Sequence, residues 1–168
     1  MRAELETTRI EGGVLGELYT RHASEALRVA YLLSGDPSMA EDLVQDAFVR
    51  LAGRLLHLRD PGGFHAYLRT TIVNLARSHF RRRAVERRFL ERQGEPRGVE
   101  APDLSDRERM RRALMELPIR QRTAVVLRYF EDLSEAQVAD LMHCRTGAVK
   151  SLVSRGLSTL RATLGEDR

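Results

Sequence analysis

The side chains with the clearest chemical potential lie near the end of the chain, in the stretch CRTGAVKSLVSRGL at residues 144–157. Helical spacing would place its hydroxyl and cationic side chains on one face, because residues three and four apart are neighbours on a helix. Such a face can hold phosphates at the helix N-terminus and reach base edges in the major groove of DNA. We therefore expect a DNA-reading helix. Its outward residues are Arg145, Thr146, Lys150, Ser151, Ser154 and Arg155.

The segment before this helix has the pattern of the first half of a helix-turn-helix. The letters SEAQ at residues 134–137 form a capping box, which marks a helix start. A small residue, Ala139, would let two helices approach closely at a steep angle. His143 stands where the turn usually has Gly, and we expect it to take a positive φ, with Cys144 as a small buried residue of the turn. The expected inward residues are Val138, Ala139, Met142, Val149, Val153 and Leu157.

The composition predicts that these elements belong to an all-α protein. Ala, Leu, Arg and Glu dominate, only 5% of residues are aromatic, and no Trp is present. Apolar periodicity predicts a first helix at residues 13–33, and Asp-Pro start signals predict a second from Asp36 to about Leu58 and a third from Asp60. The third helix would turn Phe64, Tyr67, Leu68, Ile72, Leu75, Ala76 and His79 inward.

The second half of the chain predicts a flexible linker followed by four short helices. Gly and Pro residues exclude a continuous helix beyond the Arg-rich stretch that follows Phe80. The helices would span residues 105–117, 119–131, 134–142 and 146–164. We expect a three-helix domain at 13–93, a linker at 94–104 and a four-helix domain at 105–168.

The uneven distribution of charge suggests different partners for different faces. Residues 1–46 hold nine acidic residues and four Arg, whereas residues 47–97 hold twelve Arg and four acidic residues. No apolar run is long enough to cross a bilayer and no secretory signal is visible, so we expect a cytoplasmic protein without membrane insertion.

The order of the motifs adds a family resemblance. The stretches YLLSGDPSMAEDLVQDAFVRL, FHAYLRTTIVNLARSHFRRR and LPIRQRTAVVLRYFEDLSEAQVADLMHCRTGAVKSLVSRGLSTLR together resemble the extracytoplasmic-function group of sigma-70 RNA polymerase sigma factors. The resemblance covers about residues 14–93 and 106–164, nearly the whole chain. It implies a sigma region 2-like domain that binds the polymerase core and melts the promoter. It also implies a region 4-like domain that reads the upstream element.

The resemblance also implies roles for particular residues. The segment AEDLVQDAF is similar to the family's core-binding helix, which would turn Asp42, Gln45, Asp46 and Val49 toward the clamp helices of the largest polymerase subunit. The third helix is similar to the part that captures the minus-10 element through Arg69, Asn74, Arg77, Arg81 and Arg82. The segment LPIRQRTAVVLRYFEDLS is similar to the part that docks on the flap of the second-largest subunit. Lys150, Ser151, Ser154 and Arg155 occupy the positions that read the minus-35 element.

The sequence departs from the family at a few of these positions. Tyr67 stands where many relatives have Trp, which we interpret as a conservative change in the core. Val73 replaces a common Arg and Ser78 a common Asp, and both changes leave the exact minus-10 contacts open. Leu152 replaces an Arg, so one DNA contact of relatives is missing here. An anti-sigma partner that clamps both domains is compatible with the linker, and we expect the free protein to be a monomer.

No catalytic, metal or cofactor site is predicted. A single cysteine argues against a disulfide and a structural zinc site, and the five histidines fall on separate elements without ligand spacing. Asp42 and Asp46 lie four residues apart on one helix, but a nuclease would need a third metal ligand nearby. The main alternative to a sigma factor is a self-sufficient, dimeric helix-turn-helix repressor, which would bind palindromic sites tightly without polymerase.

Overall fold

A computed structural model describes residues 2–52, 63–90 and 105–165, and the side chains of 13–52, 63–86 and 105–165. All regular structure in these ranges is helical, which confirms the all-α prediction. The chain divides into two compact units, Met1–Leu75 and Ala76–Arg168. The predicted linker at 94–104 lies outside the described residues, so the domain limits inferred from the sequence stay predictions.

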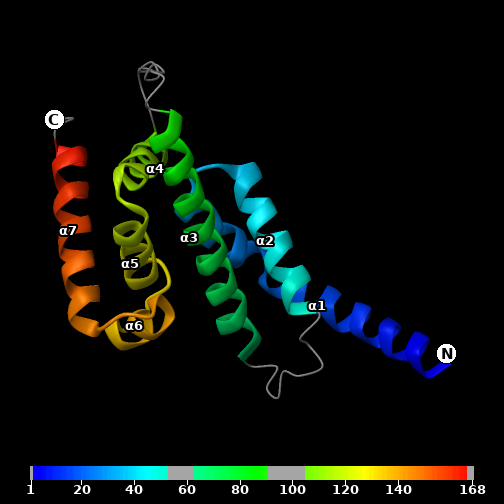
Figure 1. Ribbon diagram of the computed structural model, residues 1–168. Coiled ribbons are helices and arrows are strands. Elements are labelled where there is room, and N and C mark those ends of the chain that lie inside the picture. Colours follow the sequence, from blue (N-terminus) through cyan, green and yellow to red (C-terminus); the bar gives the residue numbers. More distant parts are fainter. Residues whose placement is uncertain (1, 53–62, 91–104, 166–168) are drawn as a thin grey trace. The chain divides into compact units, whose positions relative to one another are not determined.

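The first unit consists of α1 (Arg2–Ser34), α2 (Pro37–Ala52) and the start of α3 (Phe64–Leu90) (Figure 1). The first helix begins earlier than predicted, because Gly12 and Gly13 do not interrupt it. It ends at Ser34, and the next residue, Gly35, donates its N–H to Tyr31 O at 2.7 Å and turns the chain out of the helix with a φ of 71°. The next residue, Asp36, accepts a hydrogen bond from Met39 N at 2.8 Å, which confirms it as the cap of α2. This short reversal packs α1 against α2.

The core of the first unit is aromatic at one end and aliphatic along its length. The Phe48 ring of α2 lies 5.8 Å from the Phe64 ring of α3, and Phe64 is fully buried. The predicted end of α2 near Leu58 and the predicted start of the third helix at Asp60 lie outside the described residues. The other large buried side chains include Val29, Leu33, Val44, Leu51, Leu68 and Ile72.

Tyr67, which helical spacing placed in this core, is instead exposed, and so is Tyr19 of α1. Tyr19 is 44% exposed, although its ring lies 4.9 Å from that of Phe48, and Tyr67 is 54% exposed. The interpretation of Tyr67 as a conservative core change is therefore wrong. The adjacent Leu68 fills the buried position at this turn of α3, because it lies about 100° around the helix from Tyr67, on the side that packs in the core.

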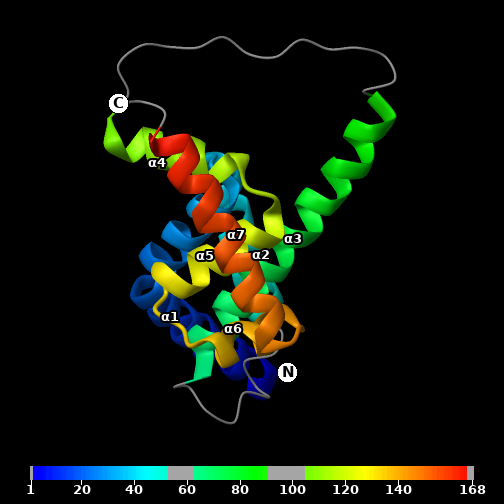
Figure 2. The same cartoon turned by 90° about the vertical axis from the view of Figure 1, so that its left-hand side faces the viewer.

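The second unit contains α4 (Asp106–Glu116), α5 (Ile119–Tyr129), α6 (Glu135–Met142) and α7 (Thr146–Gly165) (Figure 2). These bounds agree with the four predicted helices to within a few residues. Pro118 separates α4 from α5, and the buried Arg122 joins them again. Its guanidinium donates to Met115 O and Leu117 O, each at 3.1 Å, and so satisfies carbonyls at the end of α4. Burial lowers the pKa of Arg122 to about 10.

The long helix α7 lies directly against α5 (Figures 1 and 2). The contact depends on Gly156, which is buried. A Cβ atom at this position would lie 2.7 Å from Val125 Cγ2 of α5. Val149 and Leu160 are buried on the same side of α7, whereas Val153 and Leu157, predicted to point inward, are only half-buried. Because of this close contact, the buried side of α7 consists of Val149, Gly156 and Leu160.

Among the described residues, no helix is both long enough and apolar enough to span a membrane.

Candidate nucleic-acid and partner interfaces

The turn between α6 and α7 fixes the geometry of the helix-turn-helix. Ser134 and Gln137 form the predicted capping box, with Ser134 N donating to Gln137 Oε1 at 2.8 Å and Gln137 N donating to Ser134 Oγ at 3.2 Å. At the other end of α6, His143 has a φ of 52° and a ψ of 54°, as the sequence predicted. Its N–H donates to Asp140 O, and Cys144 N donates to Ala139 O at 2.9 Å. This pair of bonds is a Schellman motif, which ends the helix sharply.

Helix α7 begins immediately after this turn and shows the predicted polar face to solvent. The carbonyl of Arg145 accepts from Ala148 N at 2.9 Å, so Arg145 is the cap of α7. The Ser151 hydroxyl donates to Gly147 O at 3.1 Å, which leaves its lone pairs as acceptors for a base edge. All six outward residues predicted from the sequence are exposed, namely Arg145, Thr146, Lys150, Ser151, Ser154 and Arg155.

Two neighbours of this face differ from the simplest expectation. Leu152 is half-buried, so the apolar side chain that replaces the family's Arg contributes to packing. Cys144, predicted as a buried residue of the turn, is only half-buried. Neither side chain adds to the cationic face.

One contact on this face was missed by sequence reasoning. Lys150 Nζ lies 3.6 Å from Glu135 Oε2, and the two side chains are 67% and 40% exposed. Glu135 is the first residue of α6, so this ion pair links the two helices of the motif. The two residues are fifteen positions apart and lie on different helices, so helical periodicity gives no signal that could have found the pair.

The second interface is an acidic stripe on α2. Its buried face consists of Ala40, Leu43, Val44, Ala47, Phe48 and Leu51. The four predicted partner-binding residues Asp42, Gln45, Asp46 and Val49 are all exposed, and Val49 is 73% exposed. Their spacing of three and four residues puts them on one side of the helix. Val49 is exposed one turn after Asp46 and has no packing role in this unit, and this arrangement fits a partner surface with a basic rim.

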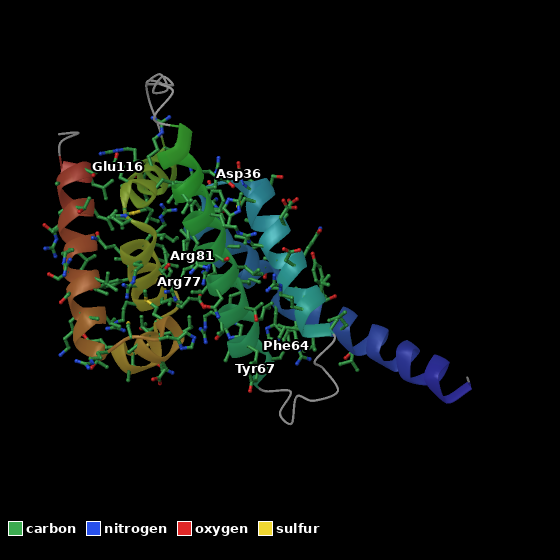
Figure 3. The ribbon with its side chains drawn as sticks, viewed as in Figure 1. Asp36, Phe64, Tyr67, Arg77, Arg81 and Glu116 are labelled. Atoms are coloured by element: carbon green, nitrogen blue, oxygen red, sulfur yellow. The ribbon has the colours of Figure 1, made fainter. Side chains whose placement is uncertain are left out.

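The third interface follows α3, where Figure 3 shows Tyr67, Arg77 and Arg81 in succession. Asn74, Arg81 and Arg82 are exposed, and Arg77 is half-buried, which lowers its pKa. At about 100° per residue, Asn74 and Arg81 share a face, whereas Arg69 lies about 140° away from Asn74. The helix therefore brings together most of the residues predicted for the downstream element but not Arg69, which is half-buried. Val73 is fully buried, so this departure from the family has no exposed side chain.

Tyr67 belongs to the same face as Asn74 and was not predicted as a site residue. The two residues are seven apart, and both are exposed. Thr70 and Thr71 lie between them, and their hydroxyls donate to Ala66 O and Tyr67 O at 2.8 Å each. An exposed ring beside an amide and arginines is the arrangement that binds single-stranded nucleic acid by stacking and phosphate contact. Tyr67 fits the apolar spacing of α3, which is why the sequence pattern placed it in the core and not on this face.

The predicted flap-docking segment also has exposed aromatic side chains. Tyr129 is 59% exposed and Phe130 is 37% exposed, at the end of α5. The chain then turns through Asp132, which has a φ of 50°. Two exposed rings in succession form an apolar patch of the kind that marks interaction sites.

Comparison with known proteins agrees with the order of these interfaces. Residues 18–86 match the family model described as Sigma-70 region 2, and residues 107–160 match the model for Sigma-70, region 4. The first match contains the acidic stripe and the α3 face, and the second contains the helix-turn-helix. The fold and its surfaces therefore define a two-region transcription initiation factor.

Individual relatives support the same assignment over most of the chain. The chain is 35% identical over 150 residues to the RNA polymerase sigma-E factor of Streptomyces coelicolor, covering 88% of this chain and 85% of the relative. It is 33% identical over 147 residues to the ECF RNA polymerase sigma factor EcfG of Rhodopseudomonas palustris, covering 82% and 78%. The chain belongs to the sigma-70 family of RNA polymerase sigma factors, in its extracytoplasmic-function group. Members of this family are not enzymes.

A solved structure gives the same fold. The sigma factor RpoE of Bartonella quintana, in complex with the anti-sigma factor NepR, is 25% identical to this chain with a TM-score of 0.72. The match covers 91% of this chain and 98% of that protein.

Proposed function

We propose that this chain is a promoter-specificity subunit that binds the RNA polymerase core, recognises the minus-35 and minus-10 elements and promotes DNA melting. The observation that carries this proposal is the exposed polar face of α7, held by the Schellman turn of a helix-turn-helix. Its six residues supply phosphate contacts at the helix start and base contacts farther along. Working on polymerase implies a cytoplasmic location.

The other two interfaces supply the remaining parts of the activity. The acidic stripe of α2 is the proposed contact with the clamp helices of the largest polymerase subunit. There, charge complementarity would give steering and register. The face of α3 is the proposed contact with the minus-10 element, where Asn74 can donate to and accept from a base edge. Tyr129 and Phe130 lie in the segment proposed to dock on the flap of the second-largest subunit.

A self-sufficient repressor is the competing function, and DNA binding without polymerase distinguishes the two. The net charge is only +4, so few phosphates are neutralised by the free chain. We expect gel shifts to show weak binding by the chain alone and sequence-specific binding after core polymerase is added. Tight, sequence-specific binding of a palindromic duplex by the isolated chain would favour the repressor.

Transcription in vitro on a library of genomic DNA with core polymerase would establish the promoter. On that promoter, Lys150→Ala and Arg155→Ala should each weaken dependence on the upstream element by about 1–3 kcal/mol, the usual cost of losing a base contact. Ser158→Ala, an exposed change farther along α7, is the matched control. Unchanged promoter choice in both the Lys150→Ala and the Arg155→Ala variant would show that the polar face of α7 does not read the upstream element.

An anti-sigma partner is a further part of the proposal, because the Bartonella quintana relative is bound to one. Purification of the tagged chain from its host would test this idea. Recovery with a second small protein in place of core polymerase is the expected result, and recovery with core polymerase alone would count against a dedicated inhibitor.

A further inference from the structure

The ion pair between Glu135 and Lys150 joins the two helices of the helix-turn-helix at its DNA-facing side. Lys150 Nζ and Glu135 Oε2 are 3.6 Å apart. Lys150 is one of the six outward residues of α7, and Glu135 occupies the first position of α6. A residue proposed to contact DNA therefore already has an anionic partner within its own motif.

The start of α6 is an unusual place for this carboxylate in a DNA-binding motif. The first helix of a helix-turn-helix crosses the DNA backbone, and a helix N-terminus is a natural phosphate site because its N–H groups are free to donate. In this chain the capping box uses Gln137 N internally, and Glu135 adds a negative charge beside it. A phosphate that approaches Lys150 from this side meets a carboxylate that holds the same cation.

The identity of the cation supports an exchange of partners. The chain contains 28 lysine and arginine residues in total, and Lys150 is the only lysine among them. An arginine can bind a carboxylate through two parallel hydrogen bonds in a fixed geometry, whereas a lysine ammonium is a compact charge on a flexible stem. Lys150 is also two-thirds exposed, so its stem can swing from Glu135 to a phosphate or a base edge.

From this geometry we propose that Glu135 competes with DNA for Lys150 and so lowers the affinity of the free subunit for DNA. This inference rests on the proposed function, because it requires Lys150 to contact DNA. When the subunit is bound to polymerase, the high effective concentration of the promoter overcomes the competition. The free subunit does not have this high effective concentration, so the ion pair lowers its occupancy of DNA.

The test measures binding of the full chain to a short fluorescent duplex of unrelated sequence by anisotropy, over a series of salt concentrations. Glu135→Gln keeps the shape of the side chain and removes its charge. We expect it to bind roughly two- to fivefold more tightly, the fold-change that corresponds to an exposed ion pair. The plot of log affinity against log salt should become steeper by up to about one unit, because Lys150 becomes fully available to a phosphate.

Asp140→Asn is the matched control. It removes the same charge from an exposed position of α6, five residues after Glu135. We expect it to change the affinity by less than Glu135→Gln. Equal gains from the two variants would overturn the inference, because they would reflect net charge alone. Binding that is unchanged or weaker in Glu135→Gln would also overturn it, since the carboxylate would then be neutral or would orient Lys150 for DNA.

A double variant separates competition from direct repulsion of phosphates. In a Lys150→Ala background, Glu135→Gln should no longer tighten binding if the carboxylate acts through Lys150. A gain that persists in this background means direct repulsion and overturns the inference. The proposed function has its own readout, the effect of Lys150→Ala on upstream-element dependence in transcription with core polymerase. If Lys150→Ala abolishes that dependence but Glu135→Gln has no effect on binding, the inference is overturned and the proposed function stands.

Discussion

Single residues of this chain divide into those whose role follows from helical spacing and those whose role depends on exposure. The outward residues of α7 and the acidic stripe of α2 were predictable, because inward residues repeat every three or four positions and leave the others outside. Tyr67 was not predictable in this way. It fits the apolar spacing of α3, and only its 54% exposure shows that it is available to a ligand.

The exposure of Tyr67 leads to a prediction about promoter melting. Tyr67→Ala should weaken open-complex formation by about 1–3 kcal/mol, the usual value of stacking one base on an aromatic side chain. Tyr67→Phe keeps the ring and should behave as the natural chain does. The measurement is permanganate reactivity of thymines in complexes with core polymerase. Equal melting by the Ala and Phe variants would show that the ring does not stack on a base.

At the scale of helices, starts and ends were predictable where side chains make local hydrogen bonds. Asp36 and Ser134 cap their helices as their sequence patterns indicated, because a cap involves residues only two or three apart. The side of α7 that packs was less predictable. Periodicity favoured Val153 and Leu157, whereas the structure buries Gly156, because a glycine lets α5 approach more closely than any side chain would.

The contact at Gly156 leads to a prediction about stability. Gly156→Ala places a Cβ atom 2.7 Å from Val125 Cγ2, and valine has a short, stiff side chain that cannot move aside. Overpacking costs about 1–3 kcal/mol, which exceeds the gain of up to about 1 kcal/mol from replacing a helical glycine. We expect a lower free energy of unfolding in chemical denaturation followed by circular dichroism.

A second glycine of α7 serves as the control for this prediction. Gly147 has nothing within 4 Å of the position of a Cβ atom, so Gly147→Ala should stabilise the chain by up to about 1 kcal/mol. Adding Val125→Ala to Gly156→Ala removes the clashing methyl group and should recover part of the loss. Equal stabilisation of both glycine variants would contradict the prediction, because it would mean that α5 leaves room for a Cβ atom at Gly156.

The first turn of α4 gives a prediction about pH. Hydrogen bonds from Arg111, with a smaller contribution from Arg112, lower the pKa of Glu108 from 4.5 to about 2. The unfolded chain therefore binds a proton more readily than the folded chain does. The ionised Glu108 therefore stabilises the folded chain above pH 4.5, and this contribution is lost as the pH falls toward about 2.

Glu108→Gln should accordingly be less stable than the natural chain at neutral pH but lose less stability on acidification. Arg111→Gln, which removes the main partner, should flatten the same part of the curve. Denaturant titrations at a series of acidic pH values would measure both. Parallel stability curves for the natural chain and the two variants would mean that this cluster does not couple folding to protons.

At the scale of the whole molecule, the proposed function depends on two DNA contacts carried by one chain. The family resemblance predicted this organisation, whereas helical patterns alone suggested only a DNA-binding module. Residues far apart in the sequence contribute to it, and pairs such as Glu135 and Lys150 arise only from the folded arrangement. Such pairs leave no periodic signal, which is why sequence reasoning missed them.

The two-contact organisation predicts how variants combine. Asn74 and Lys150 belong to different matched regions, so Asn74→Ala and Lys150→Ala should lower promoter-complex stability additively in free energy on the polymerase. Without polymerase, Asn74→Ala should leave binding to duplex DNA unchanged, because its proposed base is accessible only after melting. Competition assays with and without core polymerase would measure both effects. An equal effect of Asn74→Ala on free duplex binding would contradict its assignment to the melted strand.

The position of the chain's one lysine also has a practical consequence. Because Lys150 is the sole lysine and its side chain is 67% exposed, an amine-acylating dye can modify only one side-chain amine in the protein, apart from the α-amino group. That amine lies on the helix proposed to read DNA. The rate of dye attachment at Lys150 would therefore act as a footprint of the reading helix in the natural sequence, without any engineered label.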